Sequence, residues 1–174
     1  MITAIVGPSG AGKDTLIAGA LAARPGLRLV RRVITRPSAA GGEDFEGVTE
    51  AEFLSRVAAG DFALHWQAHG LRYGIPRAQV EGPGEVLFNG SRAALAAART
   101  TFPGLRVVVV TAPPQVLAAR LAARGREGVG DIRARLDRAG FALPDGIAAT
   151  VVVNDGTVAE GVTRLLAALQ PVRA

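Results

Sequence analysis

The sequence contains no cysteine, few aromatic residues and no long apolar run. The absence of cysteine excludes disulfides, thiolate metal sites and cysteine nucleophiles. No apolar stretch approaches the roughly 18 residues that predict a membrane span. The first residues show neither the basic region nor the small-residue cleavage site of a signal peptide. We therefore expect a cytoplasmic protein with no membrane partner.

Lysine is almost absent as well. Nineteen of the 20 basic residues are arginine, and Lys13 is the single lysine. The formal net charge of +5 raises the question of nucleic-acid binding, but the arginines are spread along the chain. Aromatic residues make up 5% of the chain, which is too few for a base-stacking platform. We expect no nucleic-acid partner.

Apolar residues are plentiful and occur in short runs. The 174 residues, 49% of them hydrophobic, are enough for one domain with a sizeable core. Strands are predicted at residues 2–6, 27–34, 85–89, 105–112 and 149–155. Because helical stretches alternate with these strands, the pattern predicts an α/β domain with a mainly parallel sheet.

Several helices carry start signals in the sequence. Thr49 and Glu52 form a capping box that is predicted to open a helix ending near residue 59. Ser91 is predicted to cap another helix. The remaining helices are expected at residues 13–24, 92–101 and 115–124, from 131 onward, and up to about 169. Residues 61–76 predict short strands around a glycine turn.

The stretch "GPSGAGKDT" joins the first predicted strand to the first predicted helix. Its glycines allow the backbone to curl so that successive N–H groups point at phosphate oxygens, and the helix N-terminus adds its positive dipole end. Lys13 would reach the outer phosphates of ATP and Thr15 an inner one. The predicted ATP-binding residues are Gly7, Pro8, Ser9, Gly10, Ala11, Gly12, Lys13, Asp14 and Thr15. The alternative is a glycine-rich turn with a surface lysine.

This loop resembles the nucleotide loop of guanylate-kinase-like enzymes, which have the fold of nucleoside-monophosphate kinases. The resemblance runs over nearly the whole chain, through "ITRP", "GEDFEGVTEAEF", "GLRYG", "RLAARG", "DIRARL" and "VVVND". It implies a three-layer P-loop kinase fold with a five-stranded parallel core sheet. It also implies a small acceptor-binding lobe near residues 35–80 and a short lid near 125–131.

The resemblance assigns roles to single residues. Arg36 and Tyr73 would contact the acceptor phosphate. Lys13, together with three arginines, would be catalytic: Arg120, Arg124 and Arg135. For each arginine the alternative is a solvated surface charge.

Five positions depart from the guanylate kinases. His65 stands where those enzymes have the glutamate that reads guanine, and Ala39 replaces the second arginine of their acceptor loop. "NGSR" offers Asn89 and Ser91 where they have aspartates, and Asp14 replaces a serine. Together these departures resemble one branch, the ribose 1,5-bisphosphate phosphokinases of phosphonate metabolism. The implied reaction moves the γ-phosphoryl group of ATP onto ribose 1,5-bisphosphate and yields 5-phosphoribosyl 1-diphosphate and ADP.

Other candidate residues keep two interpretations. Glu43 and Asp44 either position a ribose hydroxyl or solvate an exposed loop. His65 and His69 either bind the sugar hydroxyls or a phosphate of the acceptor, or are core and turn residues. Trp66 is expected in the core.

Asp14 has three interpretations. It is a helix N-terminal acid, stabilised by the dipole by roughly 0.3–1 kcal/mol, or it ligates Mg²⁺ directly, or it acts on Mg²⁺ through a water. We favour the metal role, because Mg²⁺ would remove the repulsion between this carboxylate and the phosphates. The expected cofactors are therefore ATP and Mg²⁺.

Two other functions remain open at the level of the sequence. One is a nucleoside-monophosphate kinase of the guanylate type, which the histidine at position 65 disfavours. The other is a catalytically silent binding module, which the intact Lys13 loop disfavours. The oligomeric state is left open, with a homodimer as one option.

Overall fold

The structure is a computed structural model that describes residues 1–40, 43–123 and 143–170. The chain forms two compact units. Unit 1 comprises Met1–Ala4 and Pro25–Arg106, and unit 2 comprises Ile5–Arg24 and Val107–Ala174. The predicted lid near 125–131 and the helix predicted from 131 lie outside the described residues.

A five-stranded sheet has the strand order β2-β7-β1-β8-β9. Its strands are β1 (Ile2–Val6), β2 (Leu27–Leu29), β7 (Glu85–Asn89), β8 (Arg106–Thr111) and β9 (Thr150–Val153). β2 pairs with β7 and β8 with β9, both in parallel. The inner residues of β1, β7 and β8 are buried without alternation, as expected for parallel strands covered on both faces. The predicted α/β fold with a five-stranded parallel core sheet is confirmed.

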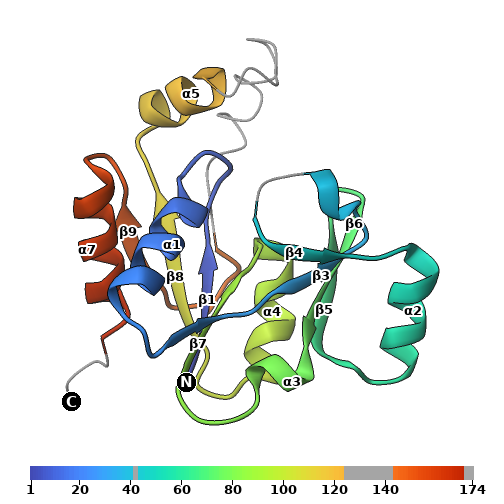
Figure 1. The fold of residues 1–174 in the computed structure, drawn as a ribbon. Helices are drawn as coiled ribbons and strands as arrows, with labels where there is room; N and C mark the ends of the chain where they lie inside the picture. Colours follow the sequence, from blue (N-terminus) through green and yellow to red (C-terminus); the bar gives the residue numbers. More distant parts are fainter. Residues whose placement is uncertain (41–42, 124–142, 171–174) are drawn as a thin grey trace. The chain divides into compact units, whose positions relative to one another are not determined.

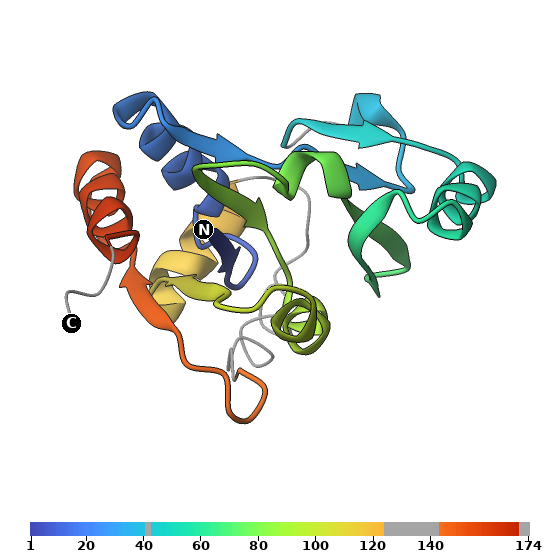
Figure 2. The same ribbon diagram turned by 90° about the horizontal axis from the view of Figure 1, so that it is seen from below.

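Among the described residues of unit 2, the helices are α1 (Lys13–Ala23), α5 (Pro114–Ala123) and α7 (Val158–Ala168). α1 and α7 lie side by side (Figure 1), and α7 also packs against β9 (Figure 2). Glycines bring α1 and α7 close together, since a Cβ atom on Gly19 would stand 2.4 Å from Val162 and one on Gly161 would stand 2.7 Å from Leu16. The two helices are therefore fixed beside each other by close packing.

Unit 1 contains a second sheet with the strand order β4-β3-β6-β5. Its strands are β3 (Arg32–Ile34), β4 (Phe45–Gly47), β5 (Phe62–Ala68) and β6 (Leu71–Pro76). β5 and β6 form an antiparallel hairpin around His69 and Gly70, whose φ angles of 52° and 74° are left-handed. This is the glycine turn that the sequence predicts.

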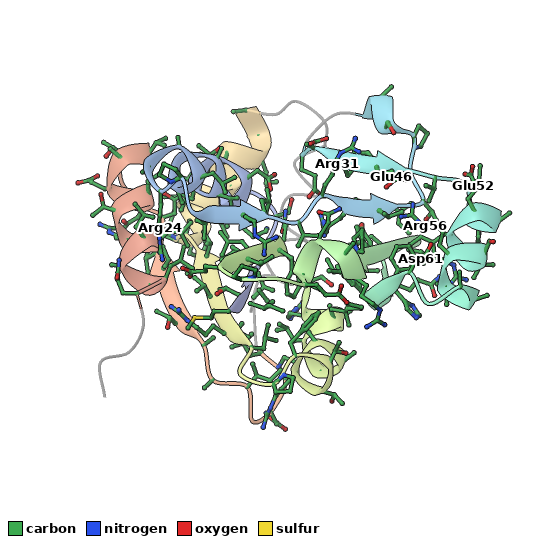
Figure 3. The ribbon with its side chains drawn as sticks, turned by 60° about the horizontal axis from the view of Figure 1, so that its bottom comes forward. Arg24, Arg31, Glu46, Glu52, Arg56 and Asp61 are labelled. Atoms are coloured by element: carbon green, nitrogen blue, oxygen red, sulfur yellow. The ribbon has the colours of Figure 1, made fainter. Side chains whose placement is uncertain are left out.

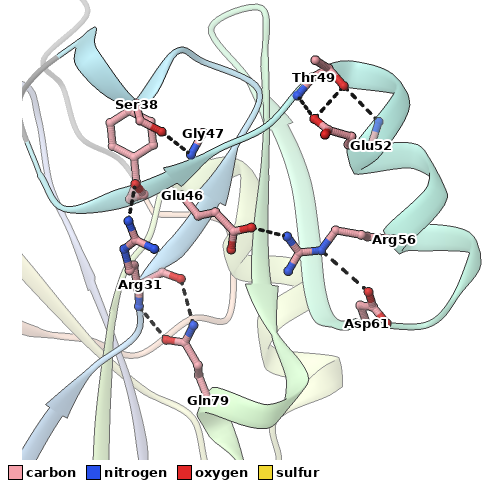
Figure 4. Close-up of polar contacts among 10 residues, drawn as sticks. Arg31, Ser38, Glu46, Gly47, Thr49, Glu52, Arg56, Asp61 and Gln79 are labelled. Atoms are coloured by element: carbon pink, nitrogen blue, oxygen red, sulfur yellow. Dashed lines mark hydrogen bonds and ion pairs between the residues drawn. The ribbon is translucent and has the colours of Figure 1, made fainter.

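The strand predicted at 27–34 is wrong as a single element, because the structure divides it between the two sheets. β2 belongs to the parallel sheet and β3 to the four-stranded sheet. Between them, the main chain of Arg31 bonds to a side chain: its N–H donates to Gln79 Oε1 at 2.7 Å and its carbonyl accepts from Gln79 Nε2 at 3.2 Å (Figure 4). The Gln79 side chain thus satisfies the backbone N–H and carbonyl of Arg31, which in a continuous strand would bond to a neighbouring strand.

Helix α2 (Glu50–Ala58) packs on one face of the four-stranded sheet. Phe53 is 1% exposed, and its ring stacks on that of Phe62 with centroids 4.8 Å apart. The predicted capping box of Thr49 and Glu52 is confirmed (Figure 4). At the rim of this face, Arg56 contacts the carboxylates of Glu46 and Asp61 at 2.7 and 3.7 Å (Figure 3).

The other helical segments of unit 1 are α3 (Arg77–Val80), α4 (Arg92–Thr101) and a short 3-10 helix, Ser38–Ala40. α4 packs against β5. Ser91 does occupy the N-cap position of α4, but its hydroxyl makes no capping hydrogen bond, so the predicted side-chain cap is wrong. Among the described residues, no helix is long and apolar enough to cross a membrane.

Candidate functional site

In unit 2, the glycine-rich loop joins β1 to α1, as the sequence predicts. The Lys13 ammonium donates to the carbonyl oxygens of Gly7 at 2.9 Å and Pro8 at 3.2 Å. These bonds turn the lysine back onto the loop that precedes it. The cation is therefore held beside the backbone groups that are expected to face phosphate.

At two positions of the loop, only glycine fits, because a Cβ atom would collide with neighbouring atoms. A Cβ atom on Gly7 would stand 1.9 Å from the Val110 carbonyl oxygen of β8. At Gly12 the φ angle of 86° is left-handed, and a Cβ atom would stand 2.6 Å from Asn154 Nδ2. Only glycine lets the loop lie this close to β8 and to the end of β9.

The Ala11 carbonyl oxygen accepts hydrogen bonds from two side chains. Asn154 Nδ2 donates to it at 2.8 Å and Arg120 Nη1 at 3.4 Å. Asn154 is 5% exposed and directly follows β9, where its own N–H donates to the Thr111 carbonyl at 2.7 Å. Arg120 is thus brought to the loop, whereas Arg124 and Arg135 lie outside the described residues.

Sequence reasoning missed Asn154 as part of this site. A signal was present, because a polar residue ends the last apolar strand, and in parallel sheets the carboxyl ends of strands carry the functional groups. The two-donor contact at Ala11 makes Asn154 a support of the phosphate loop.

Asp14 and Thr15 are both exposed in the first turn of α1. Within the described residues, no group of three or more His, Asp or Glu side chains is arranged to hold a metal ion. Mg²⁺ does not need such a group, since it commonly binds one or two carboxylates and completes its shell with phosphate oxygens and water. The position of Asp14 therefore fits a single protein ligand to Mg²⁺.

In unit 1, a stack of side chains lies on one face of the four-stranded sheet. Trp66 and Tyr73 are paired in register, and their rings stack at 5.2 Å with an interplanar angle of 9°. The guanidinium carbon of Arg32 lies 5.1 Å from the centroid of the Tyr73 ring and 5.9 Å from that of Trp66. Trp66 and Arg32 are both 7% exposed, which confirms the prediction that Trp66 is a core residue.

Glu43 and Asp44 face different arginines. The Glu43 carboxylate accepts from Arg32 Nε at 3.1 Å and from Arg32 Nη2. Asp44 accepts from Arg31 Nε at 2.9 Å, and its side chain is 80% exposed. The sequence analysis gives Glu43 and Asp44 the same two interpretations. In the structure, the Glu43 carboxylate is partly buried and the Asp44 carboxylate is solvated.

Arg36 and Tyr73 flank the same strand of unit 1. The Arg36 guanidinium carbon lies 4.4 Å from the centroid of the Phe45 ring, and the Arg36 N–H donates to the Ile34 carbonyl. Tyr73 is paired with Ile34 in register. The two residues predicted to contact the acceptor phosphate therefore share the neighbourhood of β3 with Glu43.

The two histidines lie elsewhere in the hairpin. His65 is exposed, and its ring packs edge-on against Phe53 of α2 with centroids 6.5 Å apart. Because successive strand residues point to opposite faces, His65 points away from the face that carries Trp66. His69 forms the left-handed turn at the hairpin tip.

Arg32 was also missed by sequence reasoning. It lies in the alternating apolar and basic run of residues 27–34, which was expected to form one strand. No local signal marks it, because its burial depends on Trp66, Tyr73 and Glu43.

Comparison with known proteins finds relatives that match nearly the whole chain. No protein-family model matches it. The chain is 51% identical over 177 residues to the ribose 1,5-bisphosphate phosphokinase PhnN of Ruegeria sp., covering 99% of this chain and 93% of that protein. It is 47% identical to a bifunctional ribose 1,5-bisphosphokinase-thymidine phosphorylase of Cupriavidus necator, of which it spans 28%.

A solved structure shows the same fold. The guanylate kinase of Anaplasma phagocytophilum superposes with a TM-score of 0.68 and 19% identity, covering 96% of this chain and 82% of that one. At this identity the likeness shows the fold alone.

Proposed function

This chain belongs to the family of the ribose 1,5-bisphosphate phosphokinases, and we propose that it transfers the γ-phosphoryl group of ATP to the 1-phosphate of ribose 1,5-bisphosphate. The products are 5-phosphoribosyl 1-diphosphate and ADP, formed in phosphonate metabolism. The observation that carries the proposal is the 51% identity over 99% of the chain to a relative of that name.

For this reaction the protein needs mainly to position the two substrates and to neutralise the charge of their phosphates. An oxygen of the acceptor 1-phosphate forms a bond to the γ-phosphorus while the bond from that phosphorus to the bridging oxygen of ATP breaks, and ADP leaves. The attacking oxygen is already ionised at neutral pH, so no general base is required. Catalysis then depends on holding the phosphates in line and neutralising their charge.

In this proposal the loop from Gly7 to Thr15 binds the phosphates of ATP. Lys13 neutralises the transferring group, and its bonds to the Gly7 and Pro8 carbonyls support this role by holding the ammonium at the loop. Arg120 adds positive charge beside Ala11. Asp14 holds Mg²⁺, which would supply charge neutralisation at the phosphates when bound. Arg124 and Arg135 keep their predicted catalytic roles.

Arg36 and Tyr73 bind the acceptor phosphate, and Glu43 binds the sugar. Asp44 is the weaker candidate for a sugar contact, since it is 80% exposed and pairs with Arg31. His65 and His69 stay proposed contacts of the sugar hydroxyls or of an acceptor phosphate, with His65 exposed beside Phe53 and His69 in the hairpin turn. We also propose a cytoplasmic location and no nucleic-acid partner, as the composition predicts.

A guanylate-type kinase is the second candidate. It has the fold similarity in its favour, but at position 65 the guanine-reading glutamate is replaced by histidine. A silent binding module is disfavoured by the intact Lys13 loop.

One assay tests the proposal. The purified chain is given Mg-ATP with ribose 1,5-bisphosphate and, separately, with GMP, and ADP release is measured. We expect release with the sugar bisphosphate only, and its loss in Lys13→Met. ADP release with GMP alone would overturn the assignment in favour of a guanylate-type kinase, and none with either acceptor would favour the silent module.

A further inference from the structure

Arg32 is held from two sides. The parallel rings of Tyr73 and Trp66 lie 5.1 and 5.9 Å from its guanidinium carbon. In the plane of the guanidinium, the Glu43 carboxylate accepts hydrogen bonds from both Nε and Nη2. A guanidinium stacked on aromatic rings and bonded through a two-point fork has little freedom to rotate, and it fixes the plane of the carboxylate in turn.

The pair is partly reachable from solvent and retains hydrogen-bonding capacity. The Arg32 side chain is 8% exposed and that of Glu43 is 22% exposed. The two bonds use Nε and Nη2 of the arginine, so Nη1 makes no hydrogen bond to any residue that the structure describes. Each oxygen of a carboxylate accepts more than one hydrogen bond. The pair therefore presents fixed acceptors and donors side by side with almost no net charge.

This arrangement suits a pair of neighbouring hydroxyl groups better than a phosphate. A phosphate dianion would be repelled by Glu43, whose charge already neutralises Arg32. Two hydroxyls on adjacent carbons can donate to the two carboxylate oxygens and accept from the arginine. A ribose has such a 2,3-diol, and a 2-deoxyribose does not.

We propose that Arg32 is a positioning residue that fixes the Glu43 carboxylate to accept hydrogen bonds from the 2- and 3-hydroxyl groups of the acceptor sugar, so that the pair selects ribose over 2-deoxyribose. This inference rests on the proposed function. It gives the acceptor site a means of recognising the sugar itself, separate from its phosphates.

The adjacent pair of Arg31 and Asp44 provides a matched control. It is also an ion pair between an arginine and a carboxylate, and its two residues are the sequence neighbours of Arg32 and Glu43. Its side chains are 51% and 80% exposed, so hydration competes with any ligand. Arg31→Lys should leave the choice of acceptor unchanged.

The experiment compares ribose 1,5-bisphosphate with 2-deoxyribose 1,5-bisphosphate as acceptors in the wild type, Arg32→Lys, Glu43→Gln and Arg31→Lys. Lysine keeps the charge of Arg32 without its fork, and glutamine keeps the shape of Glu43 without its charge. We expect Arg32→Lys and Glu43→Gln to lower kcat/KM for the ribose acceptor by about 10- to 100-fold, the usual worth of a charged hydrogen bond. The change should lie in KM, because hydroxyl binding is the same in the ground and transition states.

The deoxy acceptor keeps the 3-hydroxyl and lacks only the 2-hydroxyl, so with it the same two variants should lose less activity than with the ribose acceptor, and the preference for ribose should shrink. Equal losses on both acceptors would indicate a purely structural role and overturn the inference, as would a wild type that uses both acceptors equally well. Failure of the proposed function has a different signature, namely no ADP release by the wild type with ribose 1,5-bisphosphate. Thermal unfolding of each variant shows whether it is folded.

Discussion

Asn154 donates a hydrogen bond of 2.8 Å to the carbonyl oxygen of Ala11, a residue 143 positions away in the sequence. Asn154 is 5% exposed and Ala11 is fully buried. The bond ties the phosphate loop to the end of the last strand of the sheet. The loop conformation therefore depends on a residue that is itself not expected to touch ATP.

Replacing Asn154 by alanine should weaken both the fold and ATP binding. The variant removes a donor from the buried Ala11 carbonyl, which we expect to lower the free energy of unfolding by about 1–3 kcal/mol. A looser loop should also raise the KM for ATP. Urea unfolding and steady-state kinetics measure the two effects. Val151→Ala, in the strand that directly precedes Asn154 and 58% exposed, serves as the control, and an Asn154→Ala protein as stable as that control would contradict the prediction.

Gly7→Ala should disrupt the phosphate loop. The added methyl group would stand 1.9 Å from the Val110 carbonyl oxygen, which is backbone and cannot rotate away. We expect a loss of about 1–3 kcal/mol in the free energy of unfolding, typical of overpacking, together with loss of ATP binding. Gly26→Ala is the matched control, because nothing lies within 4 Å of the added Cβ atom there. Equal stability of the two variants would show that the loop can shift away from β8.

Asp14→Ser should change the dependence of the rate on Mg²⁺. A carboxylate binds Mg²⁺ more strongly than a hydroxyl, so the serine variant should need more Mg²⁺ to reach half of its maximal rate. The measurement is a Mg²⁺ titration of turnover at fixed ATP. If the Mg²⁺ titration of the Asp14→Ser variant matched that of the wild type, Asp14 would not be a Mg²⁺ ligand and would remain a helix N-terminal acid.

The two capping boxes should make stability sensitive to acid. Hydrogen bonds from the Thr49 backbone and then from its hydroxyl hold the pKa of Glu52 below its usual 4.5. The same bonds from Thr157 lower the pKa of Glu160. A carboxyl whose pKa is lowered by folding contributes its full stability above 4.5, and this stability is lost as the pH falls through the lowered pKa of the folded state.

Glutamine at these positions can still cap but cannot titrate. We therefore expect the double variant Glu52→Gln, Glu160→Gln to have a flatter profile of melting temperature against pH below 4.5 than the wild type. The measurement is thermal unfolding by circular dichroism across the acidic range. Superimposable profiles would mean that the capping carboxylates are not the source of the acid sensitivity.

Features with local causes were predicted well. The place of the glycine-rich segment between β1 and α1, the capping box at Thr49 and the glycine turn of the hairpin each follow from residues within a few positions of one another, and all three are confirmed. The capping box of Thr157 and Glu160 has the same signature and was within reach of the same reasoning.

Features with distant causes were missed. The division of residues 27–34 into β2 and β3 depends on Gln79, which lies 48 positions from Arg31. Alternation of apolar and basic residues indicated a strand, but it could not show that the chain passes from one sheet to another.

The spacing of glycines around Lys13, the apolar runs and the order of strands and helices were set by the sequence alone, because each follows from residues adjacent along the chain. Tertiary structure decided which side chains meet. It placed Asn154 against Ala11, and it set Glu43 apart from Asp44 by giving the first a buried arginine and the second a solvated one. The physical reason is that burial and hydrogen-bond partners depend on sheet order and strand register, which bring together residues far apart in sequence.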